Sequence, residues 1–331
     1  MNRRSACLLL ASIVLLLPFR SPAPLIYTPG VGWSYEPVGS EGGWRRARAK
    51  DQLIVAQDAY DKKNYSLALK AAAYLVKTWP LSDYAPQAQY LIGRCNEGKG
   101  QDEKAFNGYQ KLLETYPKSV HYDEVLQRQY EIACRFLEGE RFRIFWGYLP
   151  LYTSMDRTAE LFDKVVKNGP YSDIAPRAQM KIGQAREKQS NFPDAAKAYE
   201  LAADRYNDRA KIAADALFRQ GVAYYKQAAT ADYDQNTAAQ AIATFGDFVE
   251  SYSTDPRVPE AQKMIGALRT EQARGNFNIA EFYEKGGKLR GASTYYNEVV
   301  RLLWDDPKSP YAVQARERID SINKRLQAAK K

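Results

Sequence analysis

The amino-acid sequence predicts an all-α protein, a right-handed α-solenoid of about six helical hairpins closed by a capping helix. Three observations support this prediction. Helix-forming residues, chiefly Ala, Gln, Lys, Glu and Leu, are abundant. Nearly the same phrase occurs twice, as TWPLSDYAPQAQYLIG at 78–93 and as NGPYSDIAPRAQMKIG at 168–183. Small and aromatic residues also return at fixed offsets, which is the signature of an internal repeat.

The offsets are constant from hairpin to hairpin. From Gly93, Ala105 follows after 12 residues and Tyr109 after 16. Two later sets have the same spacing, Gly183 with Ala195 and Tyr199, and Ala280 with Ala292 and Tyr296. These are the offsets of a tetratricopeptide repeat, here with a period of 37 or 38 residues. Antiparallel helices approach closely only where side chains are small, so we expect each hairpin to cross at these positions. The tyrosine then fills the gap to the next helix.

The N-terminal residues 1–23 are predicted to be a secretory signal peptide. Arg3 and Arg4 form a basic start, residues 8–17 form an apolar core, and residues 21–23 are small residues at the cleavage offset. The apolar run is short for a transmembrane helix, and an uncleaved anchor is the alternative. Residues 24–48 are rich in Gly, Pro and aromatic residues. We expect them to form an extended segment that becomes ordered only against a surface.

The tetratricopeptide domain is predicted to occupy residues 49–331. Proline ends a second helix at Pro80, Pro117 and Pro170, because it cannot continue the hydrogen-bond ladder. Ser82 or Asp83 is expected to cap the next helix, with a proline in its first turn. The predicted hairpins are 49–80, 84–117, 121–170, 174–207, 210–253 and 256–307, and the closing helix begins at about Ser309.

Three interruptions lengthen the pattern. Residues 139–155 extend the third hairpin and bring several aromatic residues together, among them Phe145, Trp146 and Tyr148. This insertion either folds back as local core or forms an apolar patch for a partner. Residues 228–237 are polar and predict a loop. Residues 256–286 predict one long or kinked helix, with a break near Gly275–Asn276.

The composition argues against an enzyme. There is one histidine, His121, which is expected to be exposed in a link, so chemistry that needs a histidine base or several imidazole ligands is excluded. No phosphate-binding loop, dinucleotide-binding glycines, nucleophile elbow or HExxH motif occurs. A cell-wall lyase is the remaining enzymatic alternative, and no stretch outside the repeats is long enough for its domain. We therefore expect no catalysis, no cofactor and no metal.

Charge, hydropathy and cysteine content argue against further classes of function. The net charge is +9, and the cations are interleaved with acids along predicted helices, which favours a solvated surface over nucleic-acid binding. The mean hydropathy of −0.55 argues against a protein with several membrane spans. Without a CxxC pair, a zinc ribbon or redox motif is excluded. Cys95 and Cys134 are either a disulfide or two buried thiols.

The repeat also predicts a groove lined by the first helix of each hairpin. A tyrosine beside an arginine suits an extended peptide or its carboxylate, since it offers a flat apolar surface and a bidentate charge partner. A merely solvated groove is the alternative. Projection of the repeat onto this face selects Lys50, Gln57, Tyr60, Tyr90, Arg94, Glu97, Gln127, Glu131 and Arg135. The candidate protein- or peptide-binding residues are Tyr60, Tyr90, Arg94, Gln127 and Arg135, together with Phe145, Trp146 and Tyr148 of the insertion.

Residues 49–331 resemble the BamD/ComL family of outer membrane protein assembly factors. The resemblance rests on WPLSDYAPQAQYLIGRC at 79–95 with its 37-residue spacing, and on the insertion in the third hairpin. It rests also on RVPEAQKMIGALRTEQA at 257–273 and on FNIAEFYEKGGKLRGASTYYNEVVRLLWDDPKSPYAVQA at 277–315. A generic tetratricopeptide protein need not have these C-terminal features.

The resemblance implies a membrane-associated periplasmic adaptor on the inner face of the outer membrane. It implies binding of the POTRA region of the barrel-forming assembly protein, chiefly through the C-terminal repeats. It also links the N-terminal repeats to C-terminal signals of unfolded outer-membrane proteins, a role that Arg94 with Tyr60 and Tyr90 would fit. No nucleic-acid partner is expected.

One departure concerns attachment to the membrane. The family's signal ends in a Leu-x-x-Cys box, whereas here the apolar core ends in LLLPFRSPA without a cysteine. The protein then either associates through its partners and the aromatic N-terminal segment, or keeps its signal. Another envelope adaptor of the same fold, for cell-wall synthesis, division or pilus biogenesis, is the alternative function. The joined helix at 256–286 and the third-hairpin insertion favour the assembly role.

Overall fold

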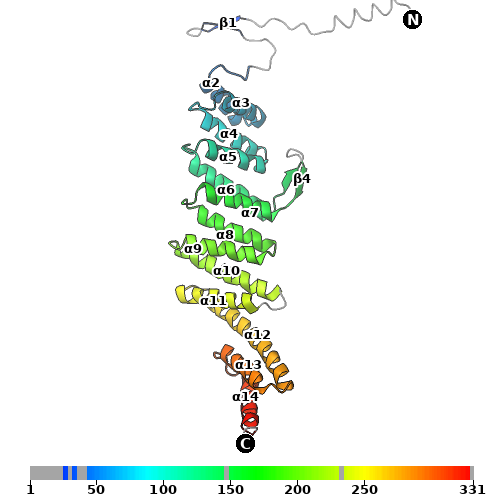
Figure 1. Cartoon of the computed structure of the whole chain (residues 1–331). Helices are drawn as coiled ribbons and strands as arrows, with labels where there is room; N and C mark the ends of the chain where they lie inside the picture. The colour runs from blue at the N-terminus through cyan, green and yellow to red at the C-terminus, as the bar shows by residue number, and fades with distance from the viewer. Residues whose placement is uncertain (1–24, 29–31, 36–42, 145–148, 231–234, 329–331) are drawn as a thin grey trace, which may run out of the picture. The chain divides into compact units, whose positions relative to one another are not determined.

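The computed structural model describes residues 25–28, 32–35, 43–144, 149–230 and 235–328 (Figure 1). This described part holds thirteen helices and four short strands. Successive helices pack as antiparallel hairpins, so the all-α class and the hairpin packing predicted from the sequence are confirmed. The chain divides into two compact units, Met1–Tyr122 and Asp123–Lys331. Within the described ranges, no helix combines the length and the apolarity that a membrane span requires.

The first unit contains two helical hairpins. Each of its helices packs against the next, and the first also contacts the third. A short antiparallel β-hairpin lies in the N-terminal segment, where Leu25 pairs with Tyr35 and Thr28 with Gly32. The elements are β1 (Leu25–Thr28), β2 (Gly32–Tyr35), α2 (Ala49–Asp61), α3 (Tyr65–Thr78), α4 (Ala85–Gly98) and α5 (Asp102–Thr115).

The second unit continues the hairpins and ends in a single helix. The helix that opens it starts at Tyr122, the last residue of the first unit. From α7 to α14 each helix packs against its successor. The elements are α6 (Tyr122–Glu138), β3 (Phe142–Ile144), β4 (Leu149–Tyr152), α7 (Met155–Asn168), α8 (Ala175–Lys188), α9 (Phe192–Arg205), α10 (Ala210–Thr230), α11 (Gln235–Ser251), α12 (Val258–Lys285), α13 (Leu289–Leu302) and α14 (Pro310–Ala328).

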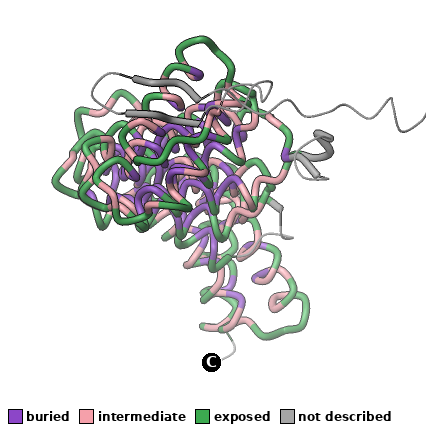
Figure 2. Tube along the Cα trace, turned by 90° about the horizontal axis from the view of Figure 1, so that it is seen from above, coloured by how far each residue is buried: buried purple, intermediate pink, exposed green. Residues whose placement is uncertain are grey.

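Small residues and tyrosines set the crossing of the two helices in a hairpin. A Cβ atom built on Gly93 or Gly183 would lie under 3.0 Å from the ring of Tyr109 or Tyr199. The predicted crossings at Gly93 and Gly183 are therefore confirmed. The ring of each tyrosine lies on the glycine of its own hairpin. Tyr199 also packs in one buried cluster with Ala216 and Ala223 of α10, so the prediction that it fills the gap to the next helix is confirmed for that hairpin. Most buried positions lie on the helices, which also carry exposed positions on their outer faces (Figure 2).

The tyrosine of each such hairpin also donates a hydrogen bond to a glutamate. The phenol oxygen of Tyr109 lies 2.6 Å from a carboxylate oxygen of Glu97, which is four residues after Gly93. The corresponding distances are 2.7 Å for Tyr199 with Glu187 and 3.0 Å for Tyr296 with Glu284. Burial, and then the hydrogen bond to Glu187, raise the pKa of Tyr199, so the phenol remains a donor at neutral pH.

One helical turn before the small residue, a buried glutamine joins the two helices of a hairpin through a hydrogen bond. The side-chain amide of Gln89 donates to the carbonyl of Gly108 at 2.8 Å. The same bond joins Gln179 to Ala198 at 3.0 Å and Gln52 to Ala71 at 3.1 Å. Buried polar groups need hydrogen-bond partners, so these amides specify the register of each hairpin as well as its closeness. The hairpins α4–α5 and α8–α9 have all four parts, the small residue, the ring, the glutamate and the glutamine, which together we call the hairpin lock.

The link before α4 differs from the sequence prediction. Neither Ser82 nor Asp83 caps the helix, because the N-cap position falls on Tyr84 and no side chain accepts a bond from the first turn. The Ser82 hydroxyl accepts instead from the backbone N–H of Tyr84 at 3.3 Å, one step before the helix. Pro86 lies in the first turn as predicted, where a missing N–H costs nothing.

The predicted break near Gly275–Asn276 is wrong, and α12 continues through it to Lys285. The Asn276 side chain donates to the carbonyl of Gln272 at 3.1 Å, so it bonds within its own helix. A glycine inside a helix costs about 1 kcal/mol relative to alanine. That cost is smaller than the benefit of one unbroken helix that packs on both α11 and α13.

The third-hairpin insertion begins as core. β3 and β4 pair antiparallel, and the Phe142 ring is buried and stacked on Phe136, with centroids 4.2 Å apart. The Arg157 guanidinium lies 4.2 Å from the Phe142 ring centroid. Phe145, Trp146 and Tyr148 lie outside the described residues, so the partner-patch alternative for them stays a prediction. The polar loop predicted at 228–237 is shorter, with α10 ending at Thr230 and α11 beginning at Gln235.

Replacing Gly183 by alanine should lower the free energy of unfolding by about 1–3 kcal/mol, because the new Cβ would overlap the Tyr199 ring. Urea denaturation followed by circular dichroism measures this change. Gly266→Ala is the matched control, since that helical glycine has open space around its Cβ position. The control should raise the free energy of unfolding by about 0.5–1 kcal/mol. Equal effects of the two substitutions would show that the crossing is not close.

Candidate peptide-binding site

Three of the candidate residues meet in the first unit. Tyr60 lies in the last turn of α2, and Tyr90 and Arg94 lie one turn apart on α4. The Arg94 guanidinium donates to the Tyr90 hydroxyl at 2.7 Å. Its central carbon is 5.6 Å from the Tyr60 ring centroid and 5.7 Å from that of Tyr90. The guanidinium is therefore held between two aromatic rings, at distances typical of cation–π contacts.

Tyr90 is the buried residue that holds Arg94 in place. Its side chain is 6% exposed, so it cannot offer a face to a ligand as the sequence analysis expected. Its ring stacks on that of His121, with centroids 3.9 Å apart and an interplanar angle of 7°. A ring nitrogen of His121 in turn contacts the side-chain oxygen of Gln87. The expectation that His121 is exposed is thus wrong: it is half-buried because the link folds over Tyr90.

The cluster is suited to holding an anion. Arg94 is half-buried, and its side chain is oriented before any ligand arrives. An oriented guanidinium loses less conformational freedom when it forms a bidentate bond to a carboxylate. Tyr60 and its neighbour Tyr65, with ring centroids 5.6 Å apart, supply half-buried aromatic surface beside it. The arrangement can therefore recognise a carboxylate next to an apolar side chain.

The other candidates lie elsewhere. Gln127 and Arg135 are both on α6, and each bonds to an acid of its own segment. The Gln127 amide donates to Glu131 at 2.7 Å, and the Arg135 guanidinium lies 3.7 Å from Glu140. These two residues form no cluster with each other. Phe145, Trp146 and Tyr148 are outside the described residues.

Sequence reasoning missed two members of the cluster, Tyr65 and His121. The glycine at position 98 is a sequence feature connected with Tyr65, because any larger residue there would bring its Cβ to 2.6 Å from the Tyr65 ring. The offset between the two residues does not belong to the repeat pattern, so the periodicity did not reveal it. For His121 the periodicity carries no signal, since a link has no regular phase.

Both described cysteines are free thiols. Cys95 is buried beside Ala59 and Ala68, and burial raises its pKa to about 11. Burial also raises the pKa of the Cys134 thiol. Thiols with raised pKa values are poor nucleophiles at neutral pH, so neither is suited to covalent catalysis. Among the residues that the structure describes, no three His, Cys, Asp or Glu side chains gather as a metal site would require.

Residues 153–303 match YfiO, a family described as outer membrane lipoprotein, and residues 87–119 match a tetratricopeptide repeat family. No curated protein matches the chain.

Solved structures that resemble the chain include tetratricopeptide-repeat proteins. The C-terminal part of a repeat protein from Cytophaga hutchinsonii is 15% identical, with 82% of this chain and 88% of that chain covered, at a TM-score of 0.34. A repeat protein from Bacteroides fragilis is 14% identical, with 84% and 99% covered, at a TM-score of 0.38. MamA from Desulfovibrio magneticus is 15% identical, with 63% and 98% covered, at a TM-score of 0.31. Likenesses this distant carry no argument about function.

Proposed function

We propose that this protein is a non-catalytic scaffold of outer-membrane β-barrel assembly. The proposal starts from two likenesses: residues 153–303 match YfiO, a family described as outer membrane lipoprotein, and residues 87–119 match a tetratricopeptide repeat family. It acts at the periplasmic face of the outer membrane, in association with that membrane. Its partners are the POTRA-bearing barrel component and unfolded outer-membrane proteins. The family match carries this proposal, and it spans the helices from α7 to α13.

The construction of the hairpins supports a scaffold. The locks fill the space between paired helices with side chains, which leaves the outer helix faces free to hold other proteins. Two large aromatic side chains near the C-terminus are exposed, Phe282 on α12 at 74% and Trp304 after α13 at 70%. Exposed aromatic residues are typical of protein interfaces. They support a binding role for the last hairpin toward the POTRA-bearing component.

The first unit supports the substrate part of the proposal. A chain terminus presents a carboxylate next to a side chain, and the Arg94 cluster offers an oriented guanidinium next to aromatic surface. We assign to it the C-terminal signal of an unfolded barrel protein. In this assignment Arg94 binds the carboxylate, Tyr60 contacts the last side chain, and Tyr90 positions Arg94.

Arg94→Glu should weaken the binding of a labelled peptide that ends in an aromatic residue with a free carboxylate. We expect a loss of about tenfold or more in affinity, the size of one charge-assisted hydrogen bond. Fluorescence anisotropy measures it. Lys70→Glu, the same charge change on an exposed residue of α3, is the control and should keep the affinity of the unaltered protein. If the amidated peptide binds as well as the free acid, Arg94 does not recognise a terminus.

Affinity purification from the native envelope in mild detergent, followed by mass spectrometry, tests the function itself. We expect a large outer-membrane barrel protein with POTRA domains to be recovered with the tagged protein. Recovery of cell-wall, division or pilus components without that barrel would contradict the assembly role. It would assign the protein to another envelope complex with the same fold.

A further inference from the structure

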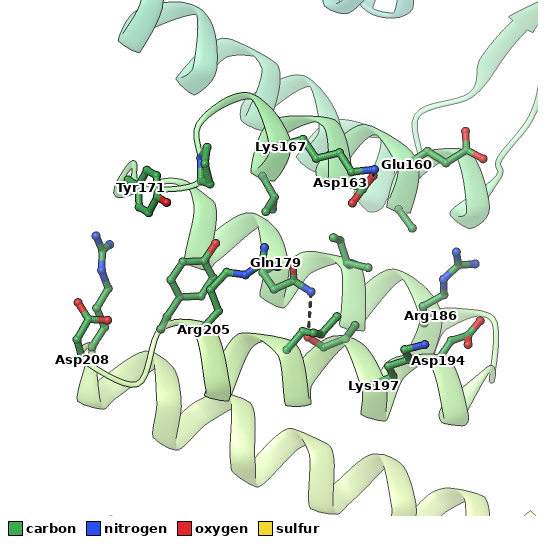
Figure 3. A pocket seen from close by; sticks show the side chains of 18 residues that line it. Glu160, Asp163, Lys167, Tyr171, Gln179, Arg186, Asp194, Lys197, Arg205 and Asp208 are labelled. Atoms are coloured by element: carbon green, nitrogen blue, oxygen red, sulfur yellow. Dashed lines mark hydrogen bonds and ion pairs between the residues drawn. The ribbon is translucent and has the colours of Figure 1, made fainter.

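A groove of about 950 Å³ lies in the second unit, in the region of α7, α8 and α9 (Figure 3). It is distinct from the Arg94 cluster, whose residues all belong to the first unit. One side is formed by α7 and the other by α9, and Gln179 of α8 lies between them with its amide bonded to the Ala198 carbonyl. A volume of this size is in the range of ligand-binding clefts.

The groove is long enough for an extended chain. Its α9 side runs from Asp194 to Arg205, which at the helical rise corresponds to a length of about 17 Å. An extended segment of about five residues has this length at about 3.3 Å per residue. The apolar lining includes Leu201, whose side chain is 43% exposed, and Tyr171, which is 96% exposed. These two residues offer contacts for the side chains of such a segment.

Three cations lie at one end of the groove, together with acids. Lys167, Arg205 and Arg209 lie where α7 and α9 end, and Asp163 and Asp208 are the acids of the lining nearest to them in the sequence. Lys167 is 2.6 Å from Asp163, and Arg209 is 3.0 Å from Asp173, so both are paired. Arg205 is exposed and makes no ion pair with any residue that the structure describes. Its guanidinium remains available to an acidic group in the groove.

The opposite end disfavours an acid. Glu160 and Asp194 lie there, at the N-terminal ends of α7 and α9. Of the cations at that end, Arg186 is paired with Asp156, which leaves Lys197. The position of an acidic side chain along the groove is thus set by charge, at the Arg205 end.

Tyr206 gives an independent indication at the same end. Its side chain lines the groove and is only 5% exposed. Its hydroxyl is buried, with no hydrogen-bond partner among the described residues. A buried hydroxyl without a partner is unfavourable, so a partner supplied by the occupant of the groove would stabilise the pair. Arg205 and Tyr206 both line the groove, and both carry a group that can donate to a carboxylate.

We propose that the groove binds an extended acidic segment of a partner protein. An aspartate or glutamate of the segment accepts hydrogen bonds from Arg205 and Tyr206, and neighbouring apolar side chains lie against Leu201 and Tyr171. The site goes beyond the terminus-binding role of Arg94, and neither site depends on the other.

The test uses the full chain and a labelled, capped heptapeptide of alternating leucine and aspartate. A matched peptide carries lysine in place of aspartate. By fluorescence anisotropy the aspartate peptide should bind saturably, about tenfold or more tighter than the lysine peptide. Arg205→Glu should lower the affinity for the aspartate peptide about tenfold or more. Lys164→Glu, an equal charge change on an exposed residue of α7 outside the groove, should leave the affinity unchanged.

Tyr206→Phe separates binding from folding. Because the hydroxyl has no partner among the described residues, its removal should leave the melting temperature unchanged or higher. The same substitution should lower the affinity for the aspartate peptide. Arg94→Glu should not affect this peptide, which distinguishes the groove from the site in the first unit.

Four outcomes would overturn the proposal. They are equal binding of the two peptides, equal losses in Arg205→Glu and Lys164→Glu, an unchanged affinity in Tyr206→Phe, and a self-association of the chain that Arg205→Glu abolishes. The last outcome would identify the occupant of the groove as a second copy.

Discussion

The structure depends on one close contact that each lock repeats, a tyrosine ring packed on a small residue of the opposite helix. In two of the hairpins that residue is Gly93 or Gly183, where even a single methyl group would overlap the ring. The ring can lie there because its hydroxyl finds a glutamate on the same opposite helix. A buried phenol without such a partner would be costly. Packing and hydrogen bonding are therefore satisfied by one side chain, and this fixes how near the two helices lie.

The proposed binding sites lie next to the lock residues. Arg94 directly follows Gly93, and the ring of its support Tyr90 lies 6.3 Å from that of Tyr109. In the second unit, the Gln179 side chain donates the hydrogen bond of a lock to the Ala198 carbonyl, and both residues also line the groove. A rigid interior thus positions surface groups that can differ from hairpin to hairpin. This is how a repeated sequence can build sites of different chemistry.

The sequence predicted the parts of the fold that follow from periodicity. The hairpins, their crossings at Gly93 and Gly183 and the closing helix from Ser309 were all available from spacing, and α14 begins at Pro310. Glu97 was predicted to lie on the binding face, but it accepts a bond from Tyr109. A helical projection identifies the face of a residue, and it does not show how far a tyrosine from the other helix can reach.

The remaining differences have separate physical reasons. His121 lies in a link, whose conformation follows from local packing on Tyr90 and not from any repeat. The helix through Gly275 is held by its neighbours on both sides, which outweighs the weak helical preference of glycine. The groove combines residues of three helices from two hairpins, so no single stretch of sequence contains its pattern. Of the candidate site, only Tyr60, Tyr90 and Arg94 could be placed together in advance, because they project onto one face of the first helices of neighbouring hairpins.

A double-mutant cycle on Tyr199 and Glu187 tests the central claim most directly. Tyr199→Phe, Glu187→Gln and the double variant would be compared by urea denaturation, with Lys226→Met to account for the ion pair between Lys226 and Glu187. If the hydrogen bond stabilises the lock, the coupling energy between the two positions should be about 1–3 kcal/mol. A coupling energy near zero would contradict the account, because the hydrogen bond to Glu187 would then contribute nothing to holding the tyrosine.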